Sequence, residues 1–319
     1  MHILNLSLAN KLRIMEKKKK VLTGLHSDEY EHPLDKEYLD IVENIPGLPL
    51  LSKKFIEWLP ETIFRVQNTG SYLKITPKSM PEIYRCLEEA TKILDLDETP
   101  DFFVKWEHSI NAYTSGVEKP FIVLNSGCID LLDRNELMFI LGHELGHIKS
   151  GHVLYHQMAD VFPALVEQAG QLTLGIAGIA GTGIQLALNN WYRMAEFTAD
   201  RAGFLVCQDK EVGMKTLIKL SGLPASFDNK NLEKCFYEQA KEFEALDQET
   251  LSRTVKLLST LNQSHPWTVM RGSEYLKWSE SGKYDEILNI DRKFIFCSNC
   301  GQRNFLIDKF CSNCGTSID

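Results

Sequence analysis

Residues 133–152 read DRNELMFILGHELGHIKSGH, and this stretch decides how the rest of the 319-residue chain has to fold. Asp133 followed three residues later by Glu136 is a capping-box pattern, which predicts that a helix starts there. Apolar residues at helical spacing follow, and Lys149 and Gly151 suit the end of a helix through the helix dipole and through backbone freedom. The sequence therefore predicts a capped amphipathic helix between Asp133 and Gly151.

Two histidines on this predicted helix, His143 and His147, are four residues apart. Residues at this spacing share one helical face, so both imidazoles can bind one ion at about 2.0–2.1 Å. Glu144 follows the first histidine and lies beside such an ion without binding it. A zinc ion lowers the pKa of its bound water to about 7, and Glu144 can then accept the proton. The pattern predicts a catalytic zinc site with Glu144 as general base.

Such a site needs a third protein ligand. His152 does not suit this role, because the pattern HExxHxxGxxH requires glycine and histidine where the chain has Ser150 and Val153. Continued as a helix, the chain would also place His152 out of phase with the two ligands. We therefore interpret His152 and His156 as solvent-facing or capping residues.

A better candidate for the third ligand lies in the segment MAEFTADRAG, residues 194–203. Glu196 and Asp200 are four residues apart among apolar neighbours, so they share a helical face that favours a cation. We predict Glu196 as the third zinc ligand and Asp200 as the residue that orients a histidine ligand. Gly203 lies near the same face and permits close approach of another helix.

The C-terminal segment contains a repeated pattern, because CSNCG at 297–301 recurs at 311–315. Two such turns present four thiolates to one tetrahedral zinc ion with Zn–S distances of about 2.3 Å. A segment this short cannot form a core, so metal binding supplies its folding energy. The sequence predicts a zinc ribbon over 293–319 with a structural zinc ion on four cysteines: Cys297, Cys300, Cys311 and Cys314.

The remaining pattern predicts an α+β fold, mainly helical, with a small sheet beside the HExxH helix and the ribbon appended. Residues 102–107, 110–114 and 121–124 are rich in aromatic and β-branched types and predict strands. Helical spacing recurs at 35–45, 81–94, 191–207, 211–221, 230–246 and 250–261, and Pro266 suits the first turn of a further helix. We expect a polar arm over 1–30, one domain over 31–285, and the ribbon.

Two segments bear on membrane contact. Residues 168–192 carry no charge and hold a glycine-rich stretch, which we interpret as the tip of a helical hairpin, either soluble or dipping into a membrane. The lysine run 17–20 could contact an anionic membrane surface. Because no secretory signal is visible, the predicted location is the cytoplasm, with membrane association as the alternative. The net charge of −8 gives no basic field, so no nucleic acid is expected as a partner.

At this point the chain resembles a known family. His143-Glu-Leu-Gly-His147 followed by Glu196 and Asp200 is similar to the gluzincin metallopeptidases that include the HtpX proteases and the CAAX prenyl endopeptidases. The resemblance is clearest over 80–285. It implies that Asn111 and Ala112 belong to an edge strand that binds an extended substrate backbone as an added strand. It also implies that His265, in the Ser-His-Pro element, donates to the oxyanion, with Arg271 supporting the site.

These observations predict a zinc-dependent metalloendopeptidase that hydrolyses protein or peptide substrates with one catalytic and one structural zinc ion. The alternative is a catalytically silent zinc-binding adaptor, in which the ribbon docks partners and the HExxH group only holds metal. The Glu144→Gln variant separates the two hypotheses, because only the peptidase would lose a measurable activity.

Overall fold

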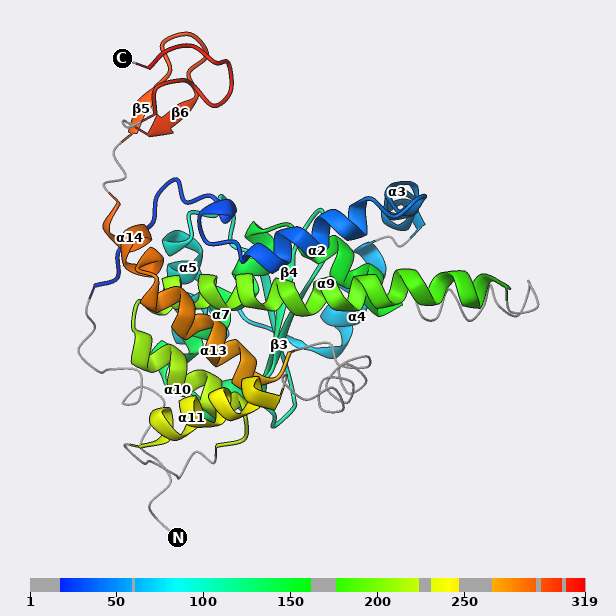
Figure 1. Cartoon of the computed structure of the whole chain (residues 1–319), viewed down its shortest axis with the longest axis vertical. Helices are drawn as coiled ribbons and strands as arrows, with labels where there is room; N and C mark the ends of the chain where they lie inside the picture. Colours follow the sequence, from blue (N-terminus) through cyan, green and yellow to red (C-terminus); the bar gives the residue numbers. More distant parts are fainter. Residues whose placement is uncertain are drawn as a thin grey trace.

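The computed structural model describes residues 18–58, 61–161, 176–223, 231–246, 266–290, 294–305 and 308–318. Over these residues the chain is an α+β protein in which helices pack beside a four-stranded sheet, and a second, two-stranded sheet belongs to the C-terminal cysteine segment (Figure 1). The predicted fold class is confirmed.

The four-stranded sheet has the order β1-β2-β4-β3 and places β3 at an edge. Strands β2 and β4 are parallel, whereas β1 pairs with β2 and β3 pairs with β4 in the antiparallel sense. The predicted strands near 102, 110 and 121 are confirmed. Their bounds are β1 Leu73–Lys74, β2 Asp101–Lys105, β3 Ala112–Ser115 and β4 Phe121–Asn125.

Alternation along the strands divides the sheet into two faces. Phe102, Ile122 and Leu124 point into the main core, where they join apolar residues of α5 (Pro81–Ile93) and α7 (Arg134–Lys149). Phe103 and Val123 point the other way and form a smaller cluster. The HExxH helix therefore packs against the face of the sheet that carries Phe102, Ile122 and Leu124.

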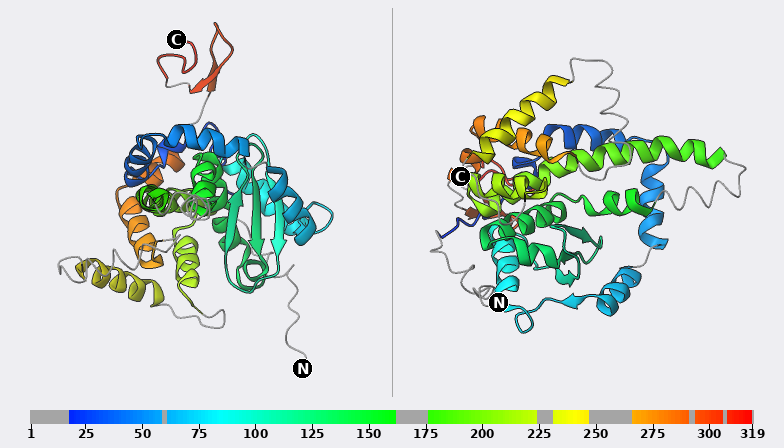
Figure 2. Two further views of the ribbon diagram at one scale, coloured as in Figure 1. Left: turned by 90° about the vertical axis from the view of Figure 1, so that its right-hand side faces the viewer. Right: turned by 90° about the horizontal axis from the view of Figure 1, so that it is seen from below.

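The HExxH helix α7 packs along the long helix α9 (Ile176–Cys207), and Figures 1 and 2 show the two side by side in the middle of the molecule. Further helices cover the C-terminal half of α9. The helix predicted at Pro266 begins two residues later, at Thr268. The bounds are α6 Ser126–Leu131, α10 Lys210–Leu220, α11 Leu232–Ala245, α13 Thr268–Glu280 and α14 Lys283–Asn289; residues 250–261 lie outside the described part.

Residues 18–30 do not form the expected polar arm. Leu22 and Tyr30 are fully buried in the main core, and Leu25 is 3% exposed, because this segment runs across the ends of the helices before the chain enters α2. Residues 1–17 lie outside the described part of the chain. The N-terminal elements that follow are η1 Ser27–Glu29, α2 Pro33–Glu43, α3 Leu48–Trp58 and α4 Glu61–Ser71.

The glycine-rich stretch before residue 184 is not the tip of a hairpin, because α9 is already helical from Ile176 onward. Glycine weakens an isolated helix by about 1 kcal/mol per residue. Packing of the same helix further along, through Leu188, Trp191 and Ala195 against α2 and α3, outweighs that cost. Residues 162–175 are not described. Among the described helices, none has the length and apolar character needed to cross a bilayer.

Candidate active site

Helix α7 is buried inside the protein and carries His143, Glu144 and His147. Its start is fixed by a reciprocal capping box, in which the Asp133 side chain accepts from the backbone N–H of Glu136 and the Glu136 side chain accepts from the backbone N–H of Asp133. The predicted cap is therefore confirmed. All three site residues are between 4% and 6% exposed. A helix buried on nearly every side holds its side chains in fixed rotamers, which suits ligands that must converge on one ion.

Helix α9 approaches α7 unusually closely beside the site. A Cβ added at Gly146 would come within 2.6 Å of Ala202 Cβ, and one added at Gly142 would come within 2.6 Å of Val206 Cβ. A Cβ at Gly203 would lie 2.8 Å from the carbonyl oxygen of Phe139. Only glycine fits these positions without separating the helices. The short interhelical distance brings Glu196 and Asp200 on α9 within reach of the two imidazoles.

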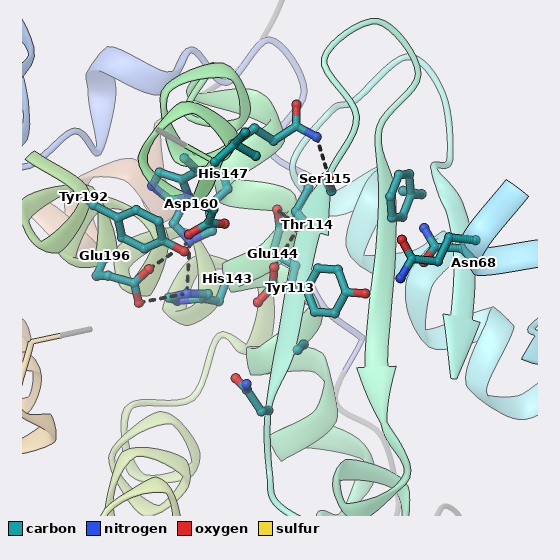
Figure 3. A pocket seen from close by; sticks show the side chains of 17 residues that line it. Asn68, Tyr113, Thr114, Ser115, His143, Glu144, His147, Asp160, Tyr192 and Glu196 are labelled. Atoms are coloured by element: carbon teal, nitrogen blue, oxygen red, sulfur yellow. Dashed lines mark hydrogen bonds and ion pairs between the residues drawn. The ribbon is translucent and has the colours of Figure 1, made fainter. Parts of the chain in front are cut away.

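The three predicted metal ligands converge. His143 Nε2 and His147 Nε2 are 3.2 Å apart, Glu196 Oε2 lies 3.4 Å from His143 Nε2, and Glu196 Oε1 lies 3.3 Å from His147 Nε2 (Figure 3). A tetrahedral zinc ion with bonds of about 2.05 Å separates its ligand atoms by roughly 3.3 Å. The spacing and the two-imidazole, one-carboxylate composition of this group therefore fit a catalytic zinc site with one open position.

Asp200 lies behind the ring of His143, on the side away from His147 and Glu196. The Nδ1–H of His143 can donate to Asp200 Oδ1 at 3.0 Å. Arg271 donates two hydrogen bonds to the same carboxylate, from Nε to Oδ2 at 2.8 Å and from Nη2 to Oδ1 at 2.5 Å. Burial alone would raise the pKa of Asp200, but the guanidinium outweighs it and keeps the pKa below its ordinary value. Asp200 is therefore a carboxylate placed to orient the ring of His143, whose Nε2 faces His147 and Glu196.

Burial and the neighbouring carboxylates act in opposite directions on the pKa values of His143 and His147. Burial disfavours the imidazolium, yet the carboxylates of Glu196 and Asp200 outweigh burial and raise the pKa of His143 to about 10. Burial lowers the pKa of His147, to about 4, so this ring is neutral. The carboxylates of Glu196 and Asp200 thus favour positive charge at this position, which is also what a divalent cation requires.

Glu144 points toward the edge strand. Thr114 Oγ1 on β3 donates to Glu144 Oε2 at 2.7 Å, and burial raises the pKa of this carboxyl above its ordinary value. A carboxylate with a raised pKa is better suited to accept a proton near neutral pH than an exposed one. Thr114 had no signal in the sequence beyond its place in a predicted strand.

His152 and His156 are not solvent-facing, which corrects the expectation from the sequence. They are 2% and 6% exposed. The expectation assumed that the helix continues past residue 150. Instead α7 ends at Lys149, and Gly151, with φ of +72°, changes the direction of the chain. As a result His152 Nδ1 lies 3.0 Å from Nδ1 of His147, and the ring of His156 stacks on Tyr192.

A pocket of about 310 Å³ lies between β3 and α9, and His143, Glu144, His147 and Glu196 are among the residues that line it. Asn111 and Ala112, predicted to contact substrate, line it at the start of the edge strand, with Asn111 exposed and Ala112 8% exposed. Figure 3 shows Glu144 between the β3 side chains and the metal-ligand group. His265 belongs to 247–265, outside the described residues, so its predicted place beside this pocket stays a prediction.

Tyr192 is a pocket residue that the sequence reasoning missed. It lies one helical turn before Glu196 on α9, and both line the same pocket. Burial raises the pKa of Tyr192 well above its ordinary value, so its hydroxyl stays protonated and can donate a hydrogen bond. The sequence did contain a signal for this residue, because Tyr192 lies four residues before Glu196 and therefore on the same helical face.

The cysteine segment forms a second metal-binding group. Strands β5 (Phe294–Phe296) and β6 (Arg303–Phe305) pair, and each CxxC turn closes on a glycine with positive φ, Gly301 and Gly315. Cys297 Sγ and Cys314 Sγ are 3.6 Å apart, and Cys300 Sγ and Cys311 Sγ are 3.5 Å apart. A zinc ion bound at about 2.3 Å separates its sulfur ligands by roughly 3.8 Å. These four thiols fit a zinc ribbon.

Comparison with known proteins agrees with this geometry. Residues 77–279 match the model of peptidase family M48. The chain is 33% identical over 273 residues to the plastoglobule-localized metallopeptidase 48, chloroplastic, of Arabidopsis thaliana, a match that covers 83% of the chain and 76% of that protein. It is 24% identical over 261 residues to a protease HtpX homolog of Burkholderia mallei (strain SAVP1), with 72% and 85% covered. No solved structure matches the chain. The resemblance to HtpX-type zinc metallopeptidases is confirmed: the chain belongs to peptidase family M48 and is a metalloprotease.

Proposed function

We propose that this metalloprotease is a zinc-dependent endopeptidase whose catalytic ion is held by His143, His147 and Glu196. The observation that carries the proposal is that the two Nε2 atoms lie 3.2 Å apart and each has one oxygen of the Glu196 carboxylate at 3.3–3.4 Å. Donor groups that already lie at about the separation found around a tetrahedral zinc ion need little reorganisation when the ion binds. The two relatives described above, a metallopeptidase and a protease, support peptide-bond hydrolysis as the reaction.

Glu144 is the general base in this proposal. When bound, zinc supplies Lewis acidity that lowers the pKa of a coordinated water and polarises the scissile carbonyl. The Glu144 carboxylate accepts the proton of the attacking water and later delivers it to the leaving amine. Thr114 donates to Oε2 of this carboxylate, which leaves Oε1 as the oxygen that accepts the proton.

The substrate binds as an extended strand against β3. This strand is the edge of the sheet and lines the pocket, so one row of its backbone groups is left unpaired by the sheet itself. Main-chain hydrogen bonds from Ala112 would place a peptide across the open coordination position without demanding a particular sequence. Asn111 lies next to it at the pocket, although its own carbonyl already accepts from the backbone N–H of Asn125 within the sheet. By family resemblance, His265 then donates to the oxyanion, an interaction typically worth about 3–4 kcal/mol.

The ribbon carries the second, structural zinc ion in this proposal. Four protein ligands leave no open position, so the ribbon performs no hydrolysis. Phe294 and Phe305 pack against Gly24, since a Cβ at Gly24 would lie within 2.7–2.9 Å of their rings. This contact favours a docking or substrate-presenting module over an independent catalytic unit.

The Glu144→Gln variant tests the proposal. We expect it to bind the same amount of zinc as the unmodified chain and to lose casein and peptide hydrolysis by at least about 10³-fold. Glu107→Gln is the matched control, because Glu107 is exposed and pairs with Lys105 away from the pocket. Undiminished turnover by Glu144→Gln, with the control also active, would remove the proposed mechanism.

A further inference from the structure

A buried carboxylate on α2, outside the segment that matches the family model, is held in a complete set of hydrogen bonds. Asp35 is 0% exposed. Its Oδ1 accepts from Trp191 Nε1 at 2.9 Å, and its Oδ2 accepts from Thr198 Oγ1 at 2.5 Å. The third partner is His152 Nε2, at 3.1 Å from Oδ2. A charge buried this completely persists only where it is fully hydrogen-bonded, so the network is a built feature of the fold.

The network continues to a metal ligand. The other ring nitrogen of His152, Nδ1, lies 3.0 Å from Nδ1 of His147. A neutral imidazole has one N–H and one lone pair. Asp35 accepts hydrogen bonds only, so the N–H of His152 is on Nε2 and its Nδ1 lone pair faces His147. That lone pair accepts the Nδ1–H of His147, which leaves the lone pair of His147 on Nε2.

We propose that Asp35 and His152 are positioning residues that set the tautomer and ring orientation of His147 for zinc binding. The inference rests on the proposed function, because it assumes that His147 Nε2 is a zinc ligand. The two histidine ligands are thereby held differently: His143 has Asp200 directly behind it, whereas His147 reaches its carboxylate through a second imidazole. Helix α2 thus completes the site from outside residues 77–279.

The same histidines allow one competing arrangement, a further metal ion bound by His147, His152 and His156. It would need the lone pair of His147 Nδ1, which is the atom that donates its proton in our proposal. The two arrangements therefore exclude each other, and metal stoichiometry distinguishes them. The ring of His156 is stacked on Tyr192 with centroids 3.7 Å apart, in line with a packing role.

The experiment compares zinc affinity, measured by competition with a chromogenic chelator, in variants of the full-length protein. His152→Phe keeps a ring but removes both hydrogen bonds, and Asp35→Asn weakens the acceptor; we expect each to bind catalytic zinc about 10–100-fold more weakly. His152→Gln can donate to Asp35 and accept from His147 through its amide, and we expect it to restore affinity to within about threefold. Asp40→Asn, exposed on the same helix, is the matched control.

A second readout follows the geometry directly. The visible spectrum of Co²⁺ in the catalytic site should change for His152→Phe and remain close to that of the unmodified protein for His152→Gln. Three results would overturn the proposal: unmodified zinc affinity in His152→Phe, equal losses in His152→Phe and His152→Gln, or the loss of a third zinc equivalent on substitution of His152. Because the readout is metal binding, it stands apart from the Glu144→Gln test of the peptidase mechanism.

Discussion

The two candidate metal-binding groups, the ribbon cysteines and the group of His143, His147 and Glu196, are built in opposite ways. The ribbon takes four cysteines from 18 consecutive residues, and two of them, Cys300 and Cys314, are exposed. The His143, His147 and Glu196 group takes three ligands from two helices that are distant in sequence, and all three are buried. In the helical domain a large apolar core holds the candidate ligands in place. In the ribbon the order is reversed, because binding of an ion by the cysteines would stabilise the fold.

This difference predicts which group depends on metal for its structure. A ribbon has too little apolar surface to fold alone, so the free energy of metal binding is its folding free energy. The helical domain has its own core around α5, α7 and α9 and needs no ion to keep its shape. Four predictions test this contrast, in order of decreasing expected effect.

Chelation should unfold the ribbon and leave the helical domain folded. Structural zinc contributes about 10–16 kcal/mol of apparent binding free energy in small cysteine- and histidine-bound modules, so its removal abolishes the ribbon fold. Limited proteolysis with and without a chelator would show new cleavage confined to residues 294–318. Cys300→Ser should lose one of two zinc ions and keep peptide turnover within about threefold. Cooperative loss of the helical domain on chelation would contradict the contrast.

Glu196→Ala should produce the reverse phenotype. Removing the third ligand should release the catalytic zinc and lower kcat/KM by at least about 10³-fold, or roughly 4 kcal/mol, while the ribbon keeps its ion. The measurement is zinc content per chain alongside casein degradation. Glu238→Ala, exposed on α11, is the control and should retain both ions. Retention of two ions by Glu196→Ala would assign the third ligand elsewhere.

Arg271→Ala should destabilise the helical domain even without metal. It leaves the buried carboxylate of Asp200 without its guanidinium, and breaking a buried pair costs about 3–5 kcal/mol. Urea unfolding in the presence of chelator isolates this effect from metal binding. The double variant Arg271→Leu with Asp200→Asn, which removes the buried charge as well, should recover much of the loss. A single variant within about 1 kcal/mol of the unmodified protein would show that the pair is not a structural element of the site.

Acid should act on the helical domain through the contact between α2 and α13. The hydrogen bond with His32, together with Lys277, lowers the pKa of Glu274 to about 2 from an ordinary 4.5. A lowered folded-state pKa contributes stability above about pH 4.5, which is lost as pH falls toward 2. Because Glu274 is partly exposed, we expect Glu274→Gln to cost only about 1–2 kcal/mol at pH 7.

The same variant should flatten the dependence of unfolding free energy on pH between about 4.5 and 2. Urea titrations across this range in chelator, with the exposed Glu280→Gln as control, would measure the slope. A slope that is unchanged in Glu274→Gln would show that another carboxyl is responsible for acid sensitivity.

The features that the sequence predicted best are those that depend on residues close together in the chain. The Asp133 cap, the four cysteines and the strands near 102 and 121 each follow from a pattern within one short segment, and the structure has all of them. The pairing of Glu196 with the histidines was predictable despite its distance, since carboxylates on an apolar helical face required a cation.

The sequence reasoning failed where a turn or distant packing decides the outcome. His152 depends on one positive-φ glycine, and no periodicity continues through such a turn. Asp35 meets Trp191 and Thr198 of α9 as well as His152, and no local pattern encodes contacts between segments this far apart in the sequence. The glycine-rich start of α9 is helical because of burial that lies further along the same helix.

The glycines between α7 and α9 have a consequence for the geometry of the candidate metal site. Gly146 and Gly142 fix how near the helix carrying Glu196 can come to the helix carrying His143 and His147. A methyl group at Gly146 would meet Ala202 Cβ at 2.6 Å and push the two helices apart, and Glu196 would move away with its helix. Residues that carry no ligand atom therefore determine whether side chains from two helices can reach one ion.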